Sequence, residues 1–344
     1  MTPNDLLFPH PIRRALLGAG LMAVAVFALS LPAPARATEA PREIKLDYAY
    51  YSPESLVIKK FGWLEEEFKP DDITVKWVLS QGSNRALEYL NSGSSDFAST
   101  SGISALVSRA NGQPVKTVYI FNTQEASTLL VAKDSTITSV PELKGKKVAA
   151  TKGTDPFFFL LRALNAHGLS KNDVQIVHLQ HPEGRTALER GDVDAWAGLD
   201  PFIAATELEA GSKTIYRNPD FSSYGFLNTS DQFIEKYPQH LQRVLNVYER
   251  ARLWILANPD QAVAIVAEAS KQSEPVIRQQ FTRANFTKAI PDAQHIGTLK
   301  ATAPLLLQEE IVRKGTDLDK YIGELVDDRF ARVAVESQAK AKGQ

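Results

Sequence analysis

Four short segments rich in hydroxyl groups and glycine stand where this sequence could do chemistry. They contain Tyr50 and Tyr51, Gln81 and Gly82, Ser99, Thr100 and Ser101, and Lys152, Gly153 and Thr154. Each segment follows a run typical of a β-strand, and three of them lead into a helical pattern. Unpaired backbone N–H groups and the helix dipole at the start of a helix both favour negative charge. The pattern therefore favours a pocket for a small oxyanion head group.

The position of these segments at strand ends is the main argument for a shared site. In open α/β sheets, ligands bind beyond the carboxyl ends of the strands. The alternative is that the Ser and Thr residues only cap the helices that follow them. Capping alone does not require every segment to lie at a strand end, so we expect the segments to converge.

Tyr51 and three further residues bear on this pocket. Tyr51 is expected to contact the apolar part of a ligand, because it lies at a strand end. Trp196 could line the pocket or belong to the core, and Asp200 could face the pocket or cap the helix that follows it. Asp155 would repel an anion if it pointed inward, so we expect it to point outward as an acidic first-turn residue.

One sequence pattern occurs twice in the helices and strands that would position these segments. Residues 86–102 and 187–197 each contain Ala-Leu-Glu, then a Gly, and three residues later an Asp that opens a short apolar run. The Gly suits a left-handed helix cap, and the run is typical of a buried parallel strand. Two similar αβ units predict two similar lobes with a cleft between them.

Short strands and helices are expected to alternate, which indicates a parallel or mixed sheet with helices on both faces. The strands are expected at residues 44–50, 73–79, 96–99, 115–121, 128–132, 147–150, 174–179, 195–198 and 214–216. The helices are expected at residues 53–68, 83–93, 157–167, 184–189, 202–210, 238–258, 259–270, 275–285 and 296–314, with another beginning at residue 102. The late helices are expected to return to the first lobe.

The first 37 residues have the composition of a secretory signal peptide. Arg13 and Arg14 precede an uncharged run at residues 15–31, and small residues end at Ala37, where we expect cleavage. The alternative is a membrane anchor, but the run is short for a span and an Ala-x-Ala sequence follows it. The chain is therefore expected to be exported to a periplasm.

Composition excludes several classes of site and partner. The chain has no Cys, which excludes disulfides, thiolate metal sites and a lipid anchor on cysteine. His178 and His181 lack the spacing of metal ligands, so no metal or cofactor is expected. Without residues 1–37 the chain carries 36 basic and 39 acidic residues, a net charge of −3. This balance argues against nucleic acid as a partner, which needs a clustered basic surface.

Several motifs together resemble one protein family. They are YAYYSP at residues 48–53, STSG at 99–102, LKGKKVA at 143–149, KGT at 152–154, LLRAL at 160–164 and GDVDAWA at 191–197. The resemblance covers nearly the whole chain after residue 37. The family is the periplasmic substrate-binding proteins of sulfonate, taurine and nitrate ABC importers, and the resemblance is greatest to the aliphatic sulfonate binders.

This resemblance implies an α/β fold of the two-lobe periplasmic-binding-protein type II, with two crossovers and the ligand in the interlobe cleft. The first lobe is expected to contain residues 38–122 and 226–344, and the second residues 126–222. The hinge is expected near residues 123–125 and 223–225.

The resemblance also implies a monomeric binding protein without catalytic residues. It would capture an alkyl, or an aryl, sulfonate and deliver it to the permease and ATPase subunits of an ABC importer for sulfur uptake. Two departures affect the ligand: Ala49 stands where many sulfonate binders have Gln, and Leu199 where many have Trp. The substitutions remove a hydrogen-bonding group and a flat wall, which would leave room for a bulkier or aromatic tail.

Other functions remain as alternatives. One is a binding protein for taurine, nitrate, bicarbonate or a thiamine-pyrimidine precursor, although a small inorganic anion needs fewer aromatic residues than this chain offers. Another is an enzyme on the same fold, as in thiamine-pyrimidine synthases, but those use a Cys-rich segment that is absent here. The sequence also contains no Gly-x-Ser-x-Gly, P-loop or His-Glu-x-x-His motif.

Overall fold

The computed structural model describes residues 40–123 and 127–342. The expected signal peptide, residues 1–37, and part of the first expected hinge segment lie outside the described residues. The described residues belong to one compact unit that begins at Glu39.

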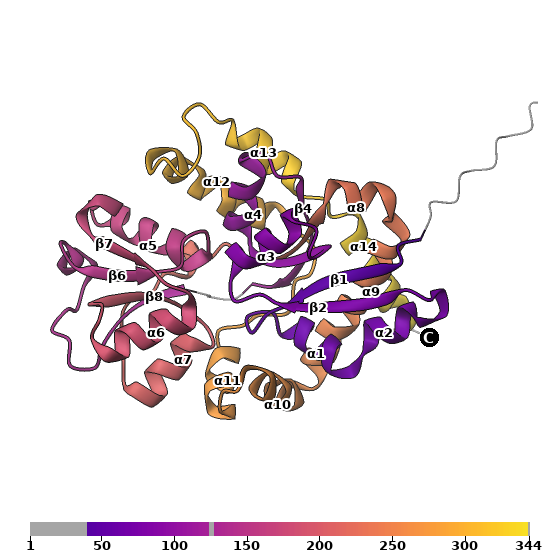
Figure 1. Ribbon diagram of the computed structural model, residues 1–344, viewed down its shortest axis with the longest axis horizontal. Helices are drawn as coiled ribbons and strands as arrows, with labels where there is room; N and C mark the ends of the chain where they lie inside the picture. The colour runs from indigo at the N-terminus through magenta and orange to yellow at the C-terminus, as the bar shows by residue number, and fades with distance from the viewer. Residues whose placement is uncertain (1–39, 124–126, 343–344) are drawn as a thin grey trace, which may run out of the picture. The chain divides into compact units, whose positions relative to one another are not determined.

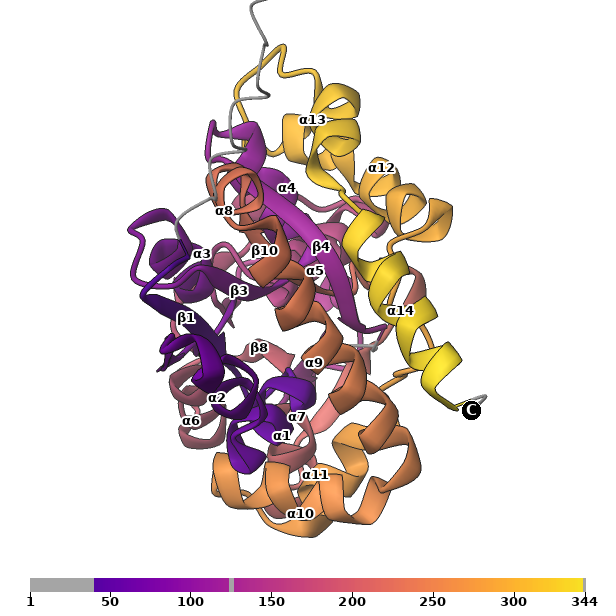
Figure 2. The same ribbon diagram turned by 90° about the vertical axis from the view of Figure 1, so that its right-hand side faces the viewer.

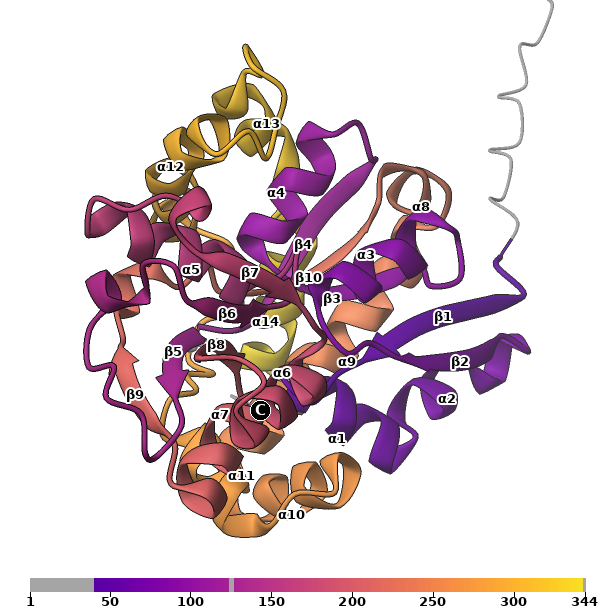
Figure 3. The same ribbon diagram turned by 60° about the vertical axis from the view of Figure 1, so that its left-hand side comes forward.

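The first sheet joins four early strands to one late strand. Its strands are β1 (Glu43–Tyr48), β2 (Thr74–Leu79), β3 (Phe97–Ser101), β4 (Val115–Asn122) and β10 (Gly225–Ser230). They lie in the order β2-β1-β3-β10-β4. Figure 1 marks β1, β2 and β4 of this sheet, and Figure 3 marks all five strands. β1 is parallel to β2 and β3, whereas β10 is antiparallel to both β3 and β4.

The second sheet repeats this arrangement with the middle of the chain. Its strands are β5 (Ser127–Val131), β6 (Lys147–Ala150), β7 (Gln175–His178), β8 (Ala195–Leu199) and β9 (Lys213–Tyr216). They lie in the order β7-β6-β8-β5-β9, with β6 parallel to its neighbours and β5 antiparallel to its neighbours (Figure 3). The expected α/β fold with two lobes is confirmed.

Helices cover both sheets. They are α1 (Pro53–Phe61), α2 (Trp63–Phe68), α3 (Ser83–Asn91), α4 (Gly102–Ala110), α5 (Asp155–Ala166), α6 (His181–Arg190), α7 (Phe202–Ala205), α8 (Asp231–Lys236), α9 (Pro238–Ala257), α10 (Pro259–Ser270), α11 (Glu274–Phe281), α12 (Ala293–Gln308), α13 (Leu318–Leu325) and α14 (Arg329–Lys342). Short 3₁₀ turns occur at Lys69–Asp71, Val140–Leu143, Lys171–Asp173 and Pro219–Phe221, and a π-helical turn at Thr206–Ala210. The late helices α9 and α14 pack on each other and on β4 (Figure 2).

The repeated Gly-x-x-Asp pattern has the same structural role in both sheets. The Asp96 carboxylate accepts a hydrogen bond from the Lys45 N–H of β1 at 2.8 Å. In the second sheet, Asp194 accepts from the Lys147 N–H of β6, also at 2.8 Å. Each Asp therefore fixes the register between a parallel strand and its neighbour.

Strand β10 was not expected from the sequence. Several of its buried residues are polar. Its sequence therefore shows neither the polar–apolar alternation nor the continuous apolar run that predicts a strand. Asn228 stabilises the strand by donating through its amide to Thr100 Oγ1 at 2.8 Å, while Thr117 donates to its carbonyl oxygen at 2.7 Å. These contacts satisfy buried polar atoms that would otherwise be costly.

Apolar clusters extend from one sheet to the other. One contains Phe226 of β10 with Leu129 of β5 and Phe157 of α5, and another contains Tyr51 with Leu199 of β8. Burial of these side chains is a main stabilising contribution and holds the two sheets close together.

Candidate functional site

A cavity opens where the edges of the two sheets meet. It is lined by Tyr51, Ser83, Thr100, Ser101, Phe121, Thr154, Asp155, Pro156, Leu199, Tyr224 and Gly225. The cavity volume is about 30 Å³, far below the roughly 300–1,000 Å³ of typical small-molecule sites, so the cavity is narrow in this arrangement of the two sheets.

Strand direction explains why these segments converge. In the first sheet, β3 ends at Ser101 and β4 at Asn122, whereas the antiparallel β10 begins beside them at Gly225. In the second sheet, β5 begins at Ser127 opposite Leu199, near the end of β8. The amino ends of antiparallel strands thus join the carboxyl ends of parallel strands at the same edge.

The cavity contains four of the residues predicted from the sequence. They are Tyr51, Thr100 and Ser101 next to the first sheet, and Thr154 next to the second. The Tyr51 hydroxyl donates to the Ser99 carbonyl at 3.0 Å, which fixes the ring as one wall. The predicted convergence of hydroxyl-bearing segments from two sheets is therefore present for these four residues.

Ser83 offers the best-placed hydrogen-bond donor of the cavity. Its Oγ accepts from the Ser101 N–H at 2.9 Å, so its own hydrogen can point into the cavity. The hydroxyl of Thr100 donates to the Ser101 carbonyl at 3.0 Å, and that of Thr154 to the Thr151 carbonyl at 2.7 Å. These two hydroxyls must rotate before they can donate to an anion.

Gly82 lies at the contact between the two sides of the cavity. It is the N-cap of α3, with an extended φ of 168° that any residue can adopt. A Cβ atom there would lie 3.1 Å from His181 Nε2 and 3.2 Å from Thr154 Cγ2. The nearest atom to such a Cβ would be Asn84 Oδ1 at 2.9 Å, so a side chain at this position is disfavoured by limited space and not by backbone conformation.

We expect Gly82→Leu to weaken ligand binding, because the larger side chain keeps the two sides of the cavity apart. Overpacking of this kind costs about 1–3 kcal/mol, which corresponds to a loss of affinity of roughly 5- to 150-fold. Calorimetric titration measures the effect. Gly323→Leu is the matched control, since nothing lies within 4 Å of a Cβ atom there. Equal affinity of Gly82→Leu and the parent chain would contradict this role.

Ser99, Lys152 and Gly153 lie near the cavity without lining it. The Ser99 N–H and hydroxyl both donate to Asp47 Oδ1, at 2.9 and 3.0 Å. Lys152 and Gly153 line a second groove, which also contains Phe157. Gly153 has a φ of +79°, so the backbone turns sharply before Thr154.

Tyr50, Gln81 and Trp196 are placed outside the cavity lining. Tyr50 is half-buried, and its carbonyl accepts from Gln280 Nε2 at 3.1 Å. Gln81 is exposed. Trp196 is fully buried, and a Cβ atom on Gly184 would lie 2.5 Å from its Nε1. Of the two positions considered from the sequence, Trp196 therefore occupies the one in the core.

Asp200 lies in a buried ion-pair network behind the cavity. Its Oδ1 accepts from the Ala204 N–H at 3.1 Å, which is the capping role considered from the sequence. Nη1 of Arg283 lies 2.9 Å from both oxygens of Asp200, and Nη2 pairs with Glu207. Burial raises the pKa of Asp200, although Arg283 opposes the shift.

Asp155 points inward, so the expectation that it faces outward is wrong. It is the first residue of α5 and only 5% exposed. Ser127 Oγ donates to Oδ2 at 2.7 Å, and Ser223 Oγ donates to Oδ1. Burial raises the pKa of Asp155, and both serine hydrogen bonds oppose the shift. The two serines precede or begin antiparallel strands, and Asp155 satisfies both hydroxyls.

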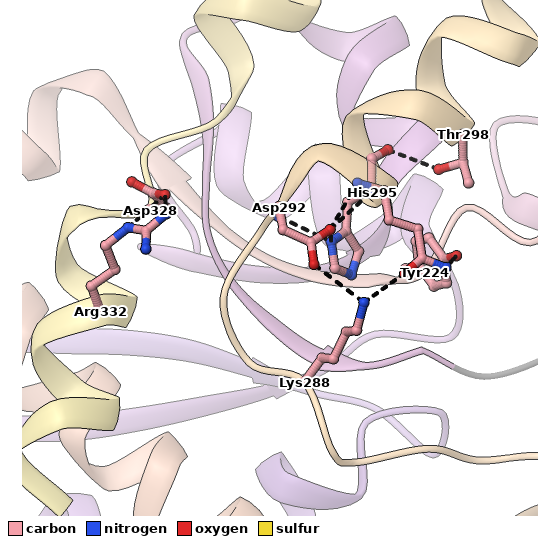
Figure 4. Close-up of polar contacts among 8 residues, drawn as sticks. Tyr224, Lys288, Asp292, His295, Thr298, Asp328 and Arg332 are labelled. Atoms are coloured by element: carbon pink, nitrogen blue, oxygen red, sulfur yellow. Dashed lines mark hydrogen bonds and ion pairs between the residues drawn. The ribbon is translucent and has the colours of Figure 1, made fainter. Parts of the chain in front are cut away.

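Tyr224 forms the edge of the cavity with a left-handed backbone, φ +61°. Its ring packs edge-on against His295, with 4.7 Å between centroids, and its hydroxyl accepts from Gln294 Nε2 at 3.2 Å (Figure 4). Asp292 Oδ1 caps α12 by accepting from the backbone N–H groups of Gln294 and His295, at 2.9 and 3.3 Å. Lys288 Nζ lies 3.2 Å from the Asp292 carboxylate. The first residues of α12 thus hold the side chain of Tyr224 in place.

His181 places a neutral hydrogen-bond acceptor beside the cavity. Burial lowers its pKa to about 3. The Thr151 hydroxyl donates to the Leu179 carbonyl at 2.6 Å, so His181 Nδ1, 3.2 Å away, donates to Thr151. Nε2 is then an unprotonated acceptor, with no hydrogen-bond partner among residues 40–123 and 127–342.

Sequence reasoning missed seven residues of the cavity lining. Ser83 lies in a segment that was singled out, and Phe121 lies at a predicted strand end. Pro156 and Asp155 belong to a predicted helix start, and Leu199 was noted only as a departure from the family. Tyr224 and Gly225 were predicted as hinge residues and not as part of the site, because the strand β10 that begins at Gly225 was not expected.

The charge of the lining is unusual for an anion site. Among the lining residues in the described ranges, none is Lys, Arg or His, and Asp155 is the one carboxylate. A bound anion must therefore be stabilised by hydroxyls and by the N-termini of α3 and α4. No group of His, Asp or Glu side chains in the described part of the chain could hold a metal ion. None of its helices is both long and apolar enough to span a membrane.

Two similar α/β lobes with a small cavity at their meeting edges define the class of two-lobed solute-binding proteins. The chain belongs to the NMT1/THI5-like family, whose model matches residues 57–262. A relative from Escherichia coli (strain K12), provisionally named an aliphatic sulfonates-binding protein, is 30% identical over 88% of this chain and 94% of its own length.

Two solved structures of similar proteins extend the comparison. The alkanesulfonate-binding protein SsuA from Xanthomonas axonopodis pv. citri, bound to MOPS, has a TM-score of 0.76 and 25% identity, over 84% of this chain and 99% of that one. The periplasmic aliphatic sulphonate binding protein SsuA from Escherichia coli has a TM-score of 0.70 and 28% identity, over 82% and 92%. The resemblance found in the sequence is confirmed.

Proposed function

We propose that this chain is the solute-binding component of an ABC importer and captures a sulfonate in the cavity between its lobes. The observation that carries the proposal is the cavity itself. One side presents the hydroxyls of Ser83, Thr100 and Ser101, which suit a sulfonate head group, and the other sides present aromatic and aliphatic walls. MOPS, bound to the Xanthomonas relative, is a sulfonate with a bulky tail. Leu199 lines the cavity where many sulfonate binders are expected to have Trp, and the smaller side chain would favour such a tail once the lobes open.

The sulfur content of the chain supports sulfonate as the ligand class. The sequence contains no Cys, and its two Met residues, Met1 and Met22, both lie in the expected signal peptide. Residues 38–344 therefore contain no sulfur. Such a composition would suit a protein that the cell makes when sulfur is scarce.

Cellular context follows from the same proposal. Residues 1–37 would direct export to the periplasm and be removed after Ala37. The remaining chain would act as a monomer and deliver the sulfonate to the permease and ATPase subunits of the importer. We propose reversible binding without turnover, in line with the binding proteins named above.

The lobes would close by rotation about two short segments, residues 123–125 and 223–225. The first lobe would contain residues 38–122 and 226–344, and the second residues 126–222. Support comes from β10, which follows the second segment and returns the chain to the first sheet. Closure would be a population shift that ligand contacts on both lobes stabilise.

A thermal-shift screen of the processed chain tests the ligand class. Alkanesulfonates and benzenesulfonate should raise the melting temperature by several degrees at about 100 times Kd. Butanoate, nitrate and sulfate should raise it little. Stabilisation by nitrate or a carboxylate alone would point to another ligand class, and hydrolysis of a sulfonate would indicate an enzyme.

Variants locate the head group. Ser83→Ala and Thr154→Ala should each weaken sulfonate binding by roughly tenfold, the value of one hydrogen bond to a charged group. Ser94→Ala, an exposed loop serine, is the matched control. Unchanged affinity of both cavity variants would place the head group elsewhere.

A further inference from the structure

We propose that His181 couples closure of the two lobes to the release of one proton, so that the chain binds its ligand less tightly in acid than at neutral pH. The proposal rests on the proposed function, because it needs a ligand that draws the lobes together. Capture of the ligand would then depend on the pH of the compartment.

A contact between the lobes carries the first step. His181 begins α6 in the second lobe, and Gly82, the N-cap of α3, lies against it from the first lobe. A Cβ atom on Gly82 would lie 3.1 Å from His181 Nε2. Beside this contact, a Cβ atom on Gly153 would lie 3.6 Å from the Cβ atom of Asn84. The start of α3 therefore covers the Nε2 edge of the imidazole ring, which is fully buried.

The narrowness of the cavity carries the second step. Its volume of about 30 Å³ is far smaller than a typical ligand site, so the lobes must part before a ligand enters. Parting moves Gly82 away from His181, and water then reaches Nε2. In the open form the imidazole is expected to titrate near its ordinary pKa of about 6.5.

The lack of an acceptor for a second proton carries the third step. Nδ1 of His181 donates to Thr151 Oγ1 at 3.2 Å, and Nε2 has no hydrogen-bond partner within the part of the chain that the structure describes. Oδ1 of Asn84 is unpartnered as well, so these two atoms are not bonded to each other. The positive end of α3 also disfavours a charge at Nε2. Burial accordingly lowers the pKa of His181 to about 3, and closure would expel the proton from Nε2 to the solvent.

Charged neighbours do not compensate a protonated His181. Several titratable or charged side chains lie on the elements around it, namely Arg85 and Glu88 of α3, Lys147 of β6, Lys152 and Asp155 at the start of α5, His178 of β7, Glu183, Arg185, Glu189 and Arg190 of α6, and Glu207 and Glu209 of the π-helical turn. Burial is nevertheless the one cause of the lowered pKa of His181. The pKa of Asp155, which also interacts with Arg162, is raised by burial, so Asp155 would favour the closed form in acid. Its effect opposes that of His181 and is the same in any variant of His181.

Calorimetric titration with propane-1-sulfonate at pH 7.5 and pH 5.5 tests the proposal. The ligand keeps its charge over this range, because sulfonic acids are strong acids. Titration of His181 between a pKa of about 6.5 in the open form and about 3 in the closed form should lower the affinity about tenfold at pH 5.5. The variant His181→Asn should lack this tenfold factor. Its side chain keeps an N–H donor for Thr151 and cannot take up a proton.

His167→Asn is the matched control, because His167 is an exposed histidine of the same lobe. It should keep the pH dependence of the parent chain. An equal change of affinity with pH in the parent chain and in folded His181→Asn would overturn the proposal.

Nuclear magnetic resonance of the imidazole groups in the parent chain decides the question even where His181→Asn fails to fold. The signal of His181 should titrate near pH 6.5 without ligand and remain that of a neutral ring at pH 5 with saturating propane-1-sulfonate. The same titration with and without ligand would also overturn the proposal. Absence of binding at pH 7.5 refutes the proposed function itself, and the coupling with it.

Discussion

The substitution Glu54→Gln is expected to favour folding more at pH 9 than at pH 4. The change that it makes in the free energy of unfolding should be more favourable at pH 9 by several kcal/mol. Glu54 is fully buried near the start of α1, and neither carboxylate oxygen has a hydrogen-bond partner among the described side chains and backbone. Burial raises its pKa to about 8, and the positive charge of Arg252 opposes the shift less strongly.

The sign follows from proton binding. With the pKa of Glu54 raised from 4.5 to about 8, the folded state holds a proton that the unfolded state has released between these values. Its favourable contribution is complete below pH 4.5 and is lost as the pH rises to 8. The shift corresponds to about 3–5 kcal/mol, a large share of the stability of a typical domain.

Urea denaturation between pH 4 and 9 measures this difference. Burial also raises the pKa of Asp47, to about 6. Asp47 therefore adds a smaller loss of the free energy of unfolding with rising pH, and this loss occurs in the variant as well as in the parent chain. The lowered pKa of His181 has the opposite effect, because it reduces the free energy of unfolding as the pH falls below 6.5. This effect is also the same in both chains. Glu235→Gln, at an exposed position, is the control. Parallel stability curves for Glu54→Gln and the parent chain would show that Glu54 is not buried as described.

Arg283→Met is expected to weaken ligand binding by about 100-fold or more. Arg283 follows α11 and pairs with Asp200 and Glu207, which follow β8 of the second sheet. The side chains of Arg283 and Asp200 are only 6% and 2% exposed. Removal of one partner from a buried ion pair costs about 3–5 kcal/mol, because the carboxylates remain without compensation. We expect the lobes to open so that water reaches these carboxylates.

A double-mutant cycle separates this effect from a general loss of stability. Asp200→Asn in the Arg283→Met background removes part of the uncompensated charge and should recover part of the affinity. Titration with a sulfonate gives the affinities, and urea denaturation gives the free energies of unfolding. Full affinity of Arg283→Met would mean that the ion pair plays no part in holding the closed form.

The sequence predicted the parts of the fold that local patterns determine. The Gly-x-x-Asp repeat identified two equivalent units, and Asp96 and Asp194 now prove to make the same strand-to-strand hydrogen bond. The helix expected at residues 53–68 is divided at Gly62, whose φ of +65° ends α1. A single glycine inside a helical pattern does not show whether the helix is interrupted.

The site was predicted less completely, because strand direction and loop direction depend on the whole fold. Asp155 points inward since Ser127 and Ser223, 28 and 68 residues away in sequence, come to lie beside it. No local pattern reveals such partners. Lys152 lines another groove because Gly153 turns the backbone between it and Thr154. The hydroxyl segments were found because the rule for parallel strands applies to them directly.

Sulfur anomalous diffraction from crystals soaked in an alkanesulfonate tests the central claim most directly. The processed chain contains no sulfur, so every sulfur peak belongs to the ligand. The account predicts one peak in the cavity, about 4 Å from the hydroxyl oxygens of Ser83 and Thr100, as hydrogen-bonded sulfonate oxygens require. An empty cavity, or a peak only in the groove beside Lys152, would contradict it.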